Sequence, residues 1–197
     1  MSVRSAITVS LVQEARGGPF VFWEGLEDAF ERSAKLGFDA VEIFPPGEEA
    51  LNVEQIEALK TKTGLNVAAV GTGAGWVKHR LHLCHPDADV RKAARRFIEG
   101  IIRKAGDLGA PAILGSMQGR VEEGVERAQA LEWLAEAVTE AGQIAAEYGQ
   151  FFLYEPLNRY ETNLIHRQAD AAQFIRAHGA SGAVSYTHLR AHETRED

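Results

Sequence analysis

The chain has 197 residues, of which 45% are hydrophobic and 25% charged, and its formal net charge is −7. This composition is ordinary for one globular domain, and an acidic balance without a basic stripe argues against a nucleic-acid partner. No apolar run approaches the ~18 residues that span a bilayer, and the N-terminus lacks the apolar centre of a signal peptide, so we expect a cytoplasmic protein. Cys84 is the single cysteine, which excludes a disulfide framework and a thiolate zinc site.

Four segments share one organisation, in which an amphipathic helix ends at a glycine and a short apolar run follows. The glycines are Gly37, Gly64, Gly109 and Gly149. Each suits the left-handed residue that closes a helix, because glycine has no Cβ to clash there. Together with an apolar run at residues 6–12, the pattern predicts five strands, each followed by a helix.

The helical period is clearest between residues 90 and 105, where apolar side chains recur at three- and four-residue steps, and Asp87 can cap the first turn of that helix. Alternating strands and helices predict a parallel sheet, either a barrel or an open doubly wound sheet. The pattern leaves both open. The absence of G-x-G-x-x-G after the first strand and of a P-loop motif disfavours a nucleotide-binding open sheet.

The C-terminal residues break this rhythm. A sixth strand is expected near Gly182, but residues 184–194, VSYTHLRAHET, resemble the translation of a transposase-type sequencing-library adaptor. Such a segment is kept out of functional reasoning, so His188, His192 and Glu193 are assigned no role. Since a (β/α)8 barrel needs about 250 residues, we expect residues 1–183 to be a TIM barrel truncated after about five β/α units and the start of a sixth strand, and residues 184–197 to be a non-native tail.

The segment QFFLYEPLNRYETNLI is the most informative for chemistry. The two-residue period of a strand places Leu153 and Glu155 on one side and Tyr154 on the other. Glu155 then lies at the carboxyl end of the strand, where parallel α/β folds bind ligands. A carboxylate there needs a compensating partner. Its position alone leaves open a salt bridge with Arg159 and a catalytic or metal-binding role.

The run EPLNRYE, residues 155–161, resembles a segment of the D-tagatose 3-epimerase and D-psicose 3-epimerase family, within the xylose-isomerase-like TIM barrels of sugar isomerases and epimerases. The resemblance covers residues 5–182, with KLGFDAVEIF and AGDLGAPAILGS in the places of the second and fourth strands. It implies that the parent protein is a (β/α)8 isomerase, either a ketose 3-epimerase or an aldose-ketose isomerase, acting on a sugar or sugar phosphate. Self-association of the parent stays open.

The resemblance also implies roles for two residues. Glu155 matches the family's divalent metal ligand, which also serves as one of two acid/base carboxylates, and Glu161 matches its substrate-hydroxyl contact. Manganese is the first expectation for the metal, with magnesium or cobalt as alternatives. The metal would polarise the ketose carbonyl, and Glu155 would remove the neighbouring proton to form an enediolate. The family's other ligands, an Asp, a His and a second Glu, lie on later strands, so the 197-residue chain itself is expected to be inactive.

Several alternatives remain at this point. Within the same barrels they are a hydroxypyruvate isomerase-like enzyme, an inositol-pathway enzyme, and an apurinic endonuclease, which the acidic charge disfavours. From another class, a non-catalytic sugar-binding module stays open, since a fold does not determine a function.

A second group of candidates lies in KHRLHLCHP, residues 78–86, which carries His79, His82, Cys84 and His85. The imidazoles and the thiol are residue types that bind soft metals, but their spacing matches no standard structural zinc pattern. The segment is therefore interpreted as a solvated loop before the helix at 90–105, with His79 or His85 contacting substrate as the alternative.

Four further candidate side chains lie near the end of a predicted strand or follow one. Glu42 either faces the pocket or pairs with a basic group. Trp23 and Trp76 either stack on a sugar ring or pack in the core. Gln118 is a candidate for binding a hydroxyl group, on position only. The glycine-rich stretch at residues 71–75 is interpreted as a tight turn at a strand end.

Overall fold

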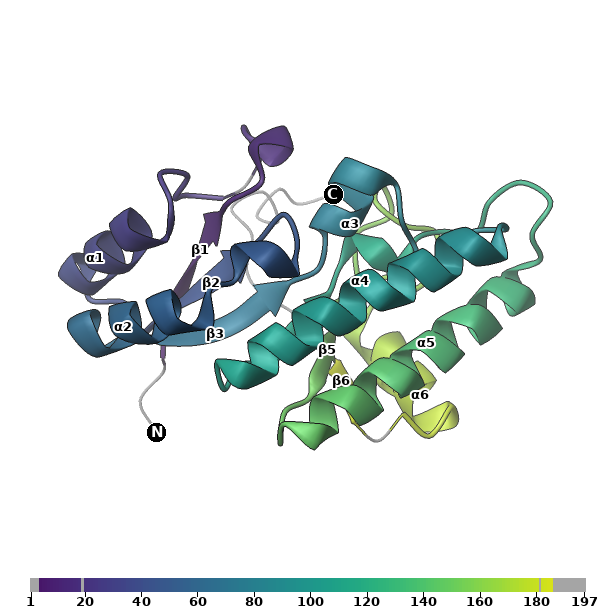
Figure 1. Cartoon of the computed structure of the whole chain (residues 1–197). Coiled ribbons are helices and arrows are strands. Elements are labelled where there is room, and N and C mark those ends of the chain that lie inside the picture. Colours follow the sequence, from purple (N-terminus) through teal and green to yellow (C-terminus); the bar gives the residue numbers. More distant parts are fainter. Residues whose placement is uncertain (1–3, 19, 181, 186–197) are drawn as a thin grey trace.

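A computed structural model describes residues 4–18, 20–180 and 182–185, which form an α/β fold (Figure 1). Its strands are β1 (Ala6–Ser10), β2 (Ala40–Phe44), β3 (Asn66–Gly71), β4 (Ala112–Leu114), β5 (Phe152–Tyr154) and β6 (Ala183–Ser185). Its helices are α1 (Leu26–Leu36), α2 (Val53–Thr63), α3 (Ala74–His79), α4 (Ala88–Asp107), α5 (Arg127–Glu147) and α6 (Gln168–Ala177). Short 3-10 turns are η1 (Gln13–Ala15), η2 (Glu48–Ala50) and η3 (Ser116–Gln118).

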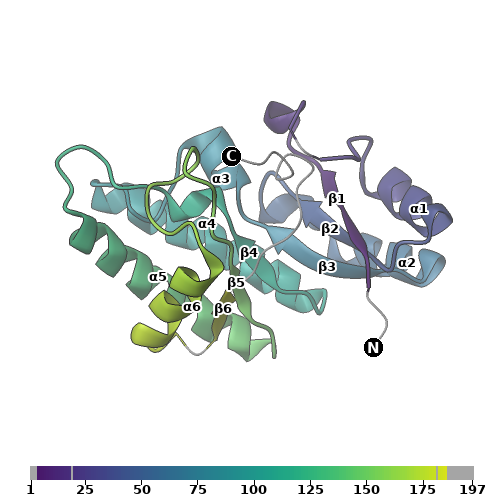
Figure 2. The ribbon, with the colours of Figure 1, turned by 180° about the vertical axis from the view of Figure 1, so that it is seen from behind.

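The strand order separates the two architectures that the sequence left open. The described strands form one sheet in the order β1-β2-β3-β4-β5-β6, and every neighbouring pair is parallel. In a doubly wound sheet the order reverses part-way, whereas each strand of a TIM barrel pairs with the next one along the chain. The long helices α4 and α5 lie side by side in front of the strands in Figure 1 and behind them in Figure 2. This is the arrangement of a barrel wall, so the predicted fold class is confirmed.

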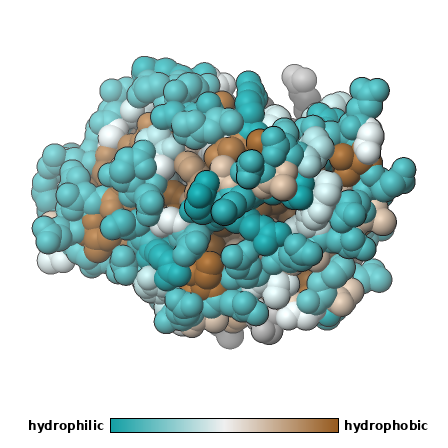
Figure 3. Space-filling view, turned by 45° about the vertical axis from the view of Figure 1, so that its right-hand side comes forward, coloured by the Kyte–Doolittle hydropathy of each residue, from teal (hydrophilic) through white to brown (hydrophobic). Residues whose placement is uncertain are grey.

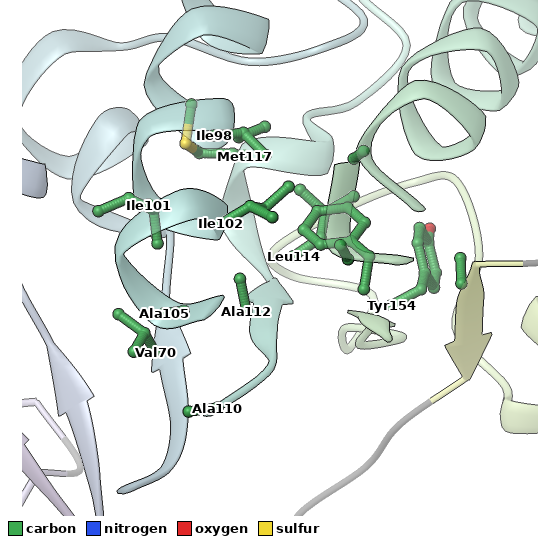
Figure 4. Close-up of a cluster of buried hydrophobic side chains, with 14 of the residues drawn as sticks. Val70, Ile98, Ile101, Ile102, Ala105, Ala110, Ala112, Leu114, Met117 and Tyr154 are labelled. Carbon is green, nitrogen blue, oxygen red and sulfur yellow. The ribbon is translucent and has the colours of Figure 1, made fainter. Parts of the chain in front are cut away.

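The main core lies between the sheet and its helices. The buried face of α4 packs with the side chains of β3 and β4, as Figure 4 shows. Its buried members are Ala94, Ile98, Ile101, Ile102 and Ala105. Each fully buried isoleucine contributes about 1.5–3 kcal/mol relative to an exposed one. The helical period predicted for residues 90–105 is therefore confirmed.

The predicted helix ends are also confirmed. Asp87 caps α4, because its side chain accepts a hydrogen bond of 2.8 Å from the backbone N–H of Asp89. The four glycines predicted to close helices all have φ between 68° and 82°. Local chemistry alone determines these positions, which explains why they are readable from the sequence.

Two details of the strands and their loops differ from the prediction. The first strand ends at Ser10 rather than at residue 12. The glycine-rich stretch at residues 71–75 ends β3 but leads directly into an additional helix, α3, whose first residue is Ala74. Six residues of helix are too short to show a clear amphipathic period in the sequence.

The expected sixth strand is present near Gly182. Ala183, Val184 and Ser185 pair in parallel with Phe152, Leu153 and Tyr154 of β5. Strand β6 therefore crosses the predicted boundary between residues 183 and 184, and that boundary stays a prediction. His188, His192 and Glu193 lie outside the described residues.

The surface carries no extended apolar face on the side shown in Figure 3, where hydrophobic side chains are scattered in small groups among hydrophilic ones. Within the part of the chain that the structure describes, no helix is long and apolar enough to span a membrane.

The contact between α5 and β6 gives a test of this packing. A Cβ at Gly142 would lie 2.9 Å from Gly182 C and 3.0 Å from Ala183 N. We expect Gly142→Ala to lower the free energy of unfolding by about 1–3 kcal/mol, because the helix must move away from the strand. Urea unfolding would measure the change. Gln143→Ala, at an exposed position of the same helix, should change it by less than about 0.5 kcal/mol.

The sign of the change in the free energy of unfolding separates a crowded Gly142 from an unobstructed one. Replacing glycine by alanine in an unobstructed helix stabilises it by up to about 1 kcal/mol. A stabilised Gly142→Ala variant would therefore contradict the close approach of α5 to β6.

Candidate functional site

A cavity of about 460 Å³ opens where β2, β3, β4 and β5 end. Residues in the last part of these strands and in the loops after them line it, and three of its side chains are the carboxylates Glu42, Glu155 and Glu161. The carboxyl ends of parallel strands meet at one edge of a sheet, and in TIM barrels ligands bind there. The cavity therefore occupies the expected place for a functional site.

Glu155 is the residue that directly follows β5. Its backbone N–H donates to the carbonyl oxygen of Leu114, over 3.0 Å, which continues the ladder between β4 and β5. The side chain is buried, with 6% of the residue exposed. A Cβ at Gly115 would lie 3.3 Å from Oε2 of Glu155, so the glycine leaves room for the carboxylate. The structure thus places Glu155 at the strand end, as the two-residue period predicts.

Gln118 holds the backbone of Glu155 in place. Its amide nitrogen donates to the carbonyl oxygens of Gly115, at 3.1 Å, and of Glu155, at 3.0 Å. Its amide oxygen accepts a hydrogen bond of 2.6 Å from the hydroxyl of Tyr154. The residue is fully buried and does not line the cavity. The prediction that Gln118 binds a substrate hydroxyl is therefore wrong, because its hydrogen-bonding groups serve the protein backbone and Tyr154.

The loop from residue 156 to residue 167 brings Glu161 to the same cavity. Asn158 shapes this loop, since its side-chain oxygen accepts from the backbone N–H groups of Tyr160, at 2.9 Å, and Glu161, at 3.2 Å. The amide nitrogen of Asn158 also donates to the Glu161 carboxylate. Thr162 ties the loop to its neighbour by donating to the Gly119 carbonyl over 2.7 Å. The fold therefore brings together the two site residues that the resemblance singled out.

Of the remaining candidates, Glu42 and Trp76 line the cavity and Trp23 does not. Glu42 lines the cavity from β2 and accepts a hydrogen bond of 3.1 Å from the Thr8 hydroxyl. Trp76 also lines the cavity. Trp23 lies outside it, and its indole N–H donates to the carbonyl of Phe20 over 3.1 Å. Of the two candidates for sugar stacking, the structure retains Trp76.

The cavity has further lining residues that the sequence did not identify. Phe20 and Phe44 stack on one another with ring centroids 4.9 Å apart, and Arg120 contributes a cation. Phe44 is the last residue of β2, while Phe20 and Arg120 lie in loops, where neither period applies. The available signal was their position in or after a predicted strand, which is too weak to identify them as cavity residues.

The segment at residues 78–86 is not a solvated loop, and that prediction is wrong. His79 ends α3, while His82 and Cys84 are fully buried. The backbone N–H of Leu83 donates to the carbonyl of Met117 over 2.9 Å, which draws the segment under the turn after β4. This contact joins residues far apart in the sequence, so the local polarity of the segment could not reveal it.

The buried Cys84 is an unreactive thiol in this environment. Its Sγ donates to the carbonyl of Ala130 over 3.3 Å, and burial raises the pKa of the thiol to about 12. A protonated thiol is neither a nucleophile nor a metal ligand.

His82, His85 and Glu122 form a separate cluster. Nε2 of His82 lies 2.9 Å from Oε1 of Glu122, and burial lowers the pKa of His82 although Glu122 acts in the opposite direction. Nδ1 of His85 accepts from the backbone N–H of Asp87 over 3.0 Å. None of these three side chains lines the cavity, and neither does His79. The alternative that His79 or His85 contacts a ligand in the cavity therefore has no support from the geometry.

Residues 30–188 match the family model named "Xylose isomerase-like TIM barrel". The chain belongs to this family. Because a fold does not determine a function, the chemistry of the site has to be argued from its side chains.

Two curated relatives are epimerases by name. The chain is 26% identical over 169 residues to D-psicose 3-epimerase of Ruminiclostridium cellulolyticum, which covers 80% of this chain and 56% of that protein. It is 28% identical over 165 residues to 3-dehydro-D-guloside 4-epimerase of Escherichia coli, covering 78% of this chain and 60% of the relative. The chain thus spans little more than half the length of these curated relatives.

Solved structures show the same fold. The apo structure of 3-keto-D-glucoside 4-epimerase from E. coli aligns with a TM-score of 0.71 and 19% identity, over 93% of this chain and 67% of that one. D-Psicose 3-epimerase from Clostridium cellulolyticum with D-tagatose aligns with a TM-score of 0.67 and 21% identity, over 92% and 62% of the two chains. The predicted relationship to the tagatose and psicose epimerases is confirmed at the level of family and fold.

The hydrogen bond between Tyr154 and Gln118 yields a prediction. We expect Tyr154→Phe to lower the free energy of unfolding by about 1–2 kcal/mol, because it leaves the buried amide oxygen of Gln118 without its donor. Chemical denaturation would measure the loss. Tyr160→Phe is the matched control, since Tyr160 is 78% exposed, and it should change stability by less than about 0.5 kcal/mol. Equal effects of the two substitutions would contradict the role assigned to Gln118.

Cys84 yields a second prediction. With its pKa raised to about 12 and its side chain buried, the thiol should resist a thiol-specific disulfide reagent at pH 8 in the folded protein and react promptly after unfolding in guanidinium chloride. Absorbance of the released chromophore reports both rates. Rapid labelling of the folded chain would show that the segment around Cys84 opens readily.

Proposed function

We propose that the cavity is part of the active site of a divalent-metal-dependent sugar or sugar phosphate epimerase or isomerase. One observation carries the proposal: Glu155 and Glu161 line a single cavity at the carboxyl end of β5, in a chain similar to D-psicose 3-epimerase. Because the chain spans 56% and 60% of its curated relatives, the activity is proposed for the whole protein.

The donor chemistry of the cavity fits a hard divalent cation. Glu155 offers carboxylate oxygens in a buried position, where an ionised carboxylate needs positive charge or donors to offset its desolvation. Oxygen ligands of this kind suit manganese, which we propose, and also magnesium or cobalt. Glu155 would hold the ion. When bound, the ion supplies a Lewis acid that polarises a ketose carbonyl.

The residues of the chain would then move one proton. Glu155 acts as the general base and removes the proton from the carbon next to the carbonyl, which gives an enediolate. Gln118 keeps Glu155 at the required position through the backbone carbonyl of that residue. Glu161 accepts a hydrogen bond from a substrate hydroxyl, and Trp76 forms part of the wall that limits access of water.

The fate of the proton decides the product. Return to the opposite face of the same carbon gives the epimer, and return to the neighbouring carbon gives the aldose. A single base returns the proton to the face from which it came, which suffices for transfer to the neighbouring carbon but not for epimerisation. Since Glu155 is both the one acid/base carboxylate and the one metal ligand that we assign among the described residues, we propose that the 197-residue chain alone does not turn over a sugar.

Binding measurements test this function without requiring turnover. We expect Mn²⁺ to bind the whole protein, in which the remaining ligands would join Glu155, and to promote binding of D-psicose or D-tagatose, as measured by calorimetry. Glu155→Gln should lower the Mn²⁺ affinity at least about tenfold, because it removes a charged oxygen ligand. Glu161→Gln should weaken sugar binding and leave Mn²⁺ affinity within about twofold. Glu54→Gln, at an exposed position of α2, should change neither affinity by more than about twofold.

The alternatives predict different results. Sugar binding that is indifferent to Mn²⁺ and to Glu155→Gln would favour a non-catalytic sugar-binding module. Epimerisation by the 197-residue chain above a metal-free control would show that a second acid/base group is present within it.

A further inference from the structure

The cluster of His82, His85 and Glu122 lies outside the proposed active site and serves none of its steps. The loop between α3 and α4 contributes both histidines, and the loop between η3 and α5 contributes the glutamate. One nitrogen of each ring and one carboxylate oxygen lie within 4.8 Å of one another. The two imidazole rings meet edge to face, with centroids 5.1 Å apart.

We propose that these three side chains form a Zn²⁺ site that joins the two loops. Two imidazoles and one carboxylate are a known three-residue set for zinc, with water as the fourth ligand. Imidazole nitrogen suits zinc better than it suits the hard ions that carboxylate oxygens prefer. The site is therefore chemically distinct from the carboxylate-lined cavity.

His82 is the fully buried member of the cluster. Its Nε2 faces the Glu122 carboxylate, so Nε2 is the ring nitrogen that would bind the ion. A buried imidazole in contact with a second imidazole and a carboxylate provides the side-chain ligands that such a zinc site requires.

The geometry requires only a small rearrangement. Nε2 of His82 and Oε1 of Glu122 are 2.9 Å apart, near the separation of about 3.3 Å between two ligand atoms in a tetrahedral zinc shell. His85 is partly exposed, and its side chain can move inward by rotation. If His85 coordinates the ion through Nδ1, it loses the hydrogen bond from the Asp87 N–H. Because Asp87 is exposed, water can accept a hydrogen bond from that N–H instead.

The surroundings define what such a site would do. The Trp76 ring packs edge-on against His82 with centroids 5.5 Å apart, and Trp76 is also part of the cavity wall. The zinc site would therefore lie behind that wall and stabilise the loops that carry it. Cys84, two residues from His82, stays outside the ligand set because its protonated thiol donates to Ala130.

The test uses the 197-residue chain after treatment with a chelator. We expect it to bind one Zn²⁺ in a competition titration against a chromophoric chelator, and Co²⁺ as a substitute to give d–d absorption typical of four-coordinate nitrogen and oxygen ligands. Zinc should also raise the thermal unfolding temperature, since a ligand that binds only the folded state stabilises it.

Conservative variants locate the site. His85→Gln and Glu122→Gln, both at partly exposed positions, should each lower the Zn²⁺ affinity at least about tenfold and abolish the cobalt spectrum. His79→Gln is the matched control from the same segment and should change the Zn²⁺ affinity by less than about twofold. Glu155→Gln should likewise leave Zn²⁺ binding intact, so that failure of this proposal is separate from failure of the proposed function.

Three outcomes would overturn the proposal. They are Zn²⁺ affinity unchanged by both cluster variants, Zn²⁺ binding lost in Glu155→Gln, and no four-coordinate cobalt spectrum for the unaltered chain. Circular dichroism of each variant confirms that the fold is retained, and the thermal shift with zinc gives a second readout that does not depend on the colour of the cobalt complex.

Discussion

The site depends on the buried amide of Gln118. This side chain connects the end of β4 with the end of β5 by donating to the carbonyls of Gly115 and Glu155, and it accepts from the hydroxyl of Tyr154. Each of these groups would be costly to bury without a partner. Because they satisfy one another, the two strand ends keep a fixed spacing, and the Glu155 carboxylate lies beside Gly115.

The parallel order of the strands extends this constraint to the whole cavity. When each strand pairs with the next and the helices pack on one face, all carboxyl ends meet at one edge of the sheet. Glu42 from β2 and Glu155 after β5 then line the same cavity, although they are far apart in the sequence. Three carboxylates therefore share this cavity with the cationic side chain of Arg120.

The loops on this side of the sheet are held by contacts of a different kind. Thr162 donates to the carbonyl of Gly119, and His82 meets Glu122 across the neighbouring loop. These contacts involve side chains and backbone from segments without helical or strand periodicity. Carboxylates gather inside the cavity, and imidazoles gather behind its wall at Trp76. The two metal sites that we propose at this end of the sheet thus differ in their donor atoms.

The sequence by itself determined the features that local chemistry controls. These include the strand–helix alternation, the capping of α4 by Asp87, the helix-closing glycines and the place of Glu155 at a strand end. Only the tertiary structure decided between a barrel wall and an open sheet. It also showed that His82 and Cys84 are buried and that Gln118 positions Glu155 rather than binding a ligand. The reason is physical: capping and periodicity depend on neighbours within a few residues, whereas strand order and loop burial depend on contacts between distant segments that no short pattern encodes.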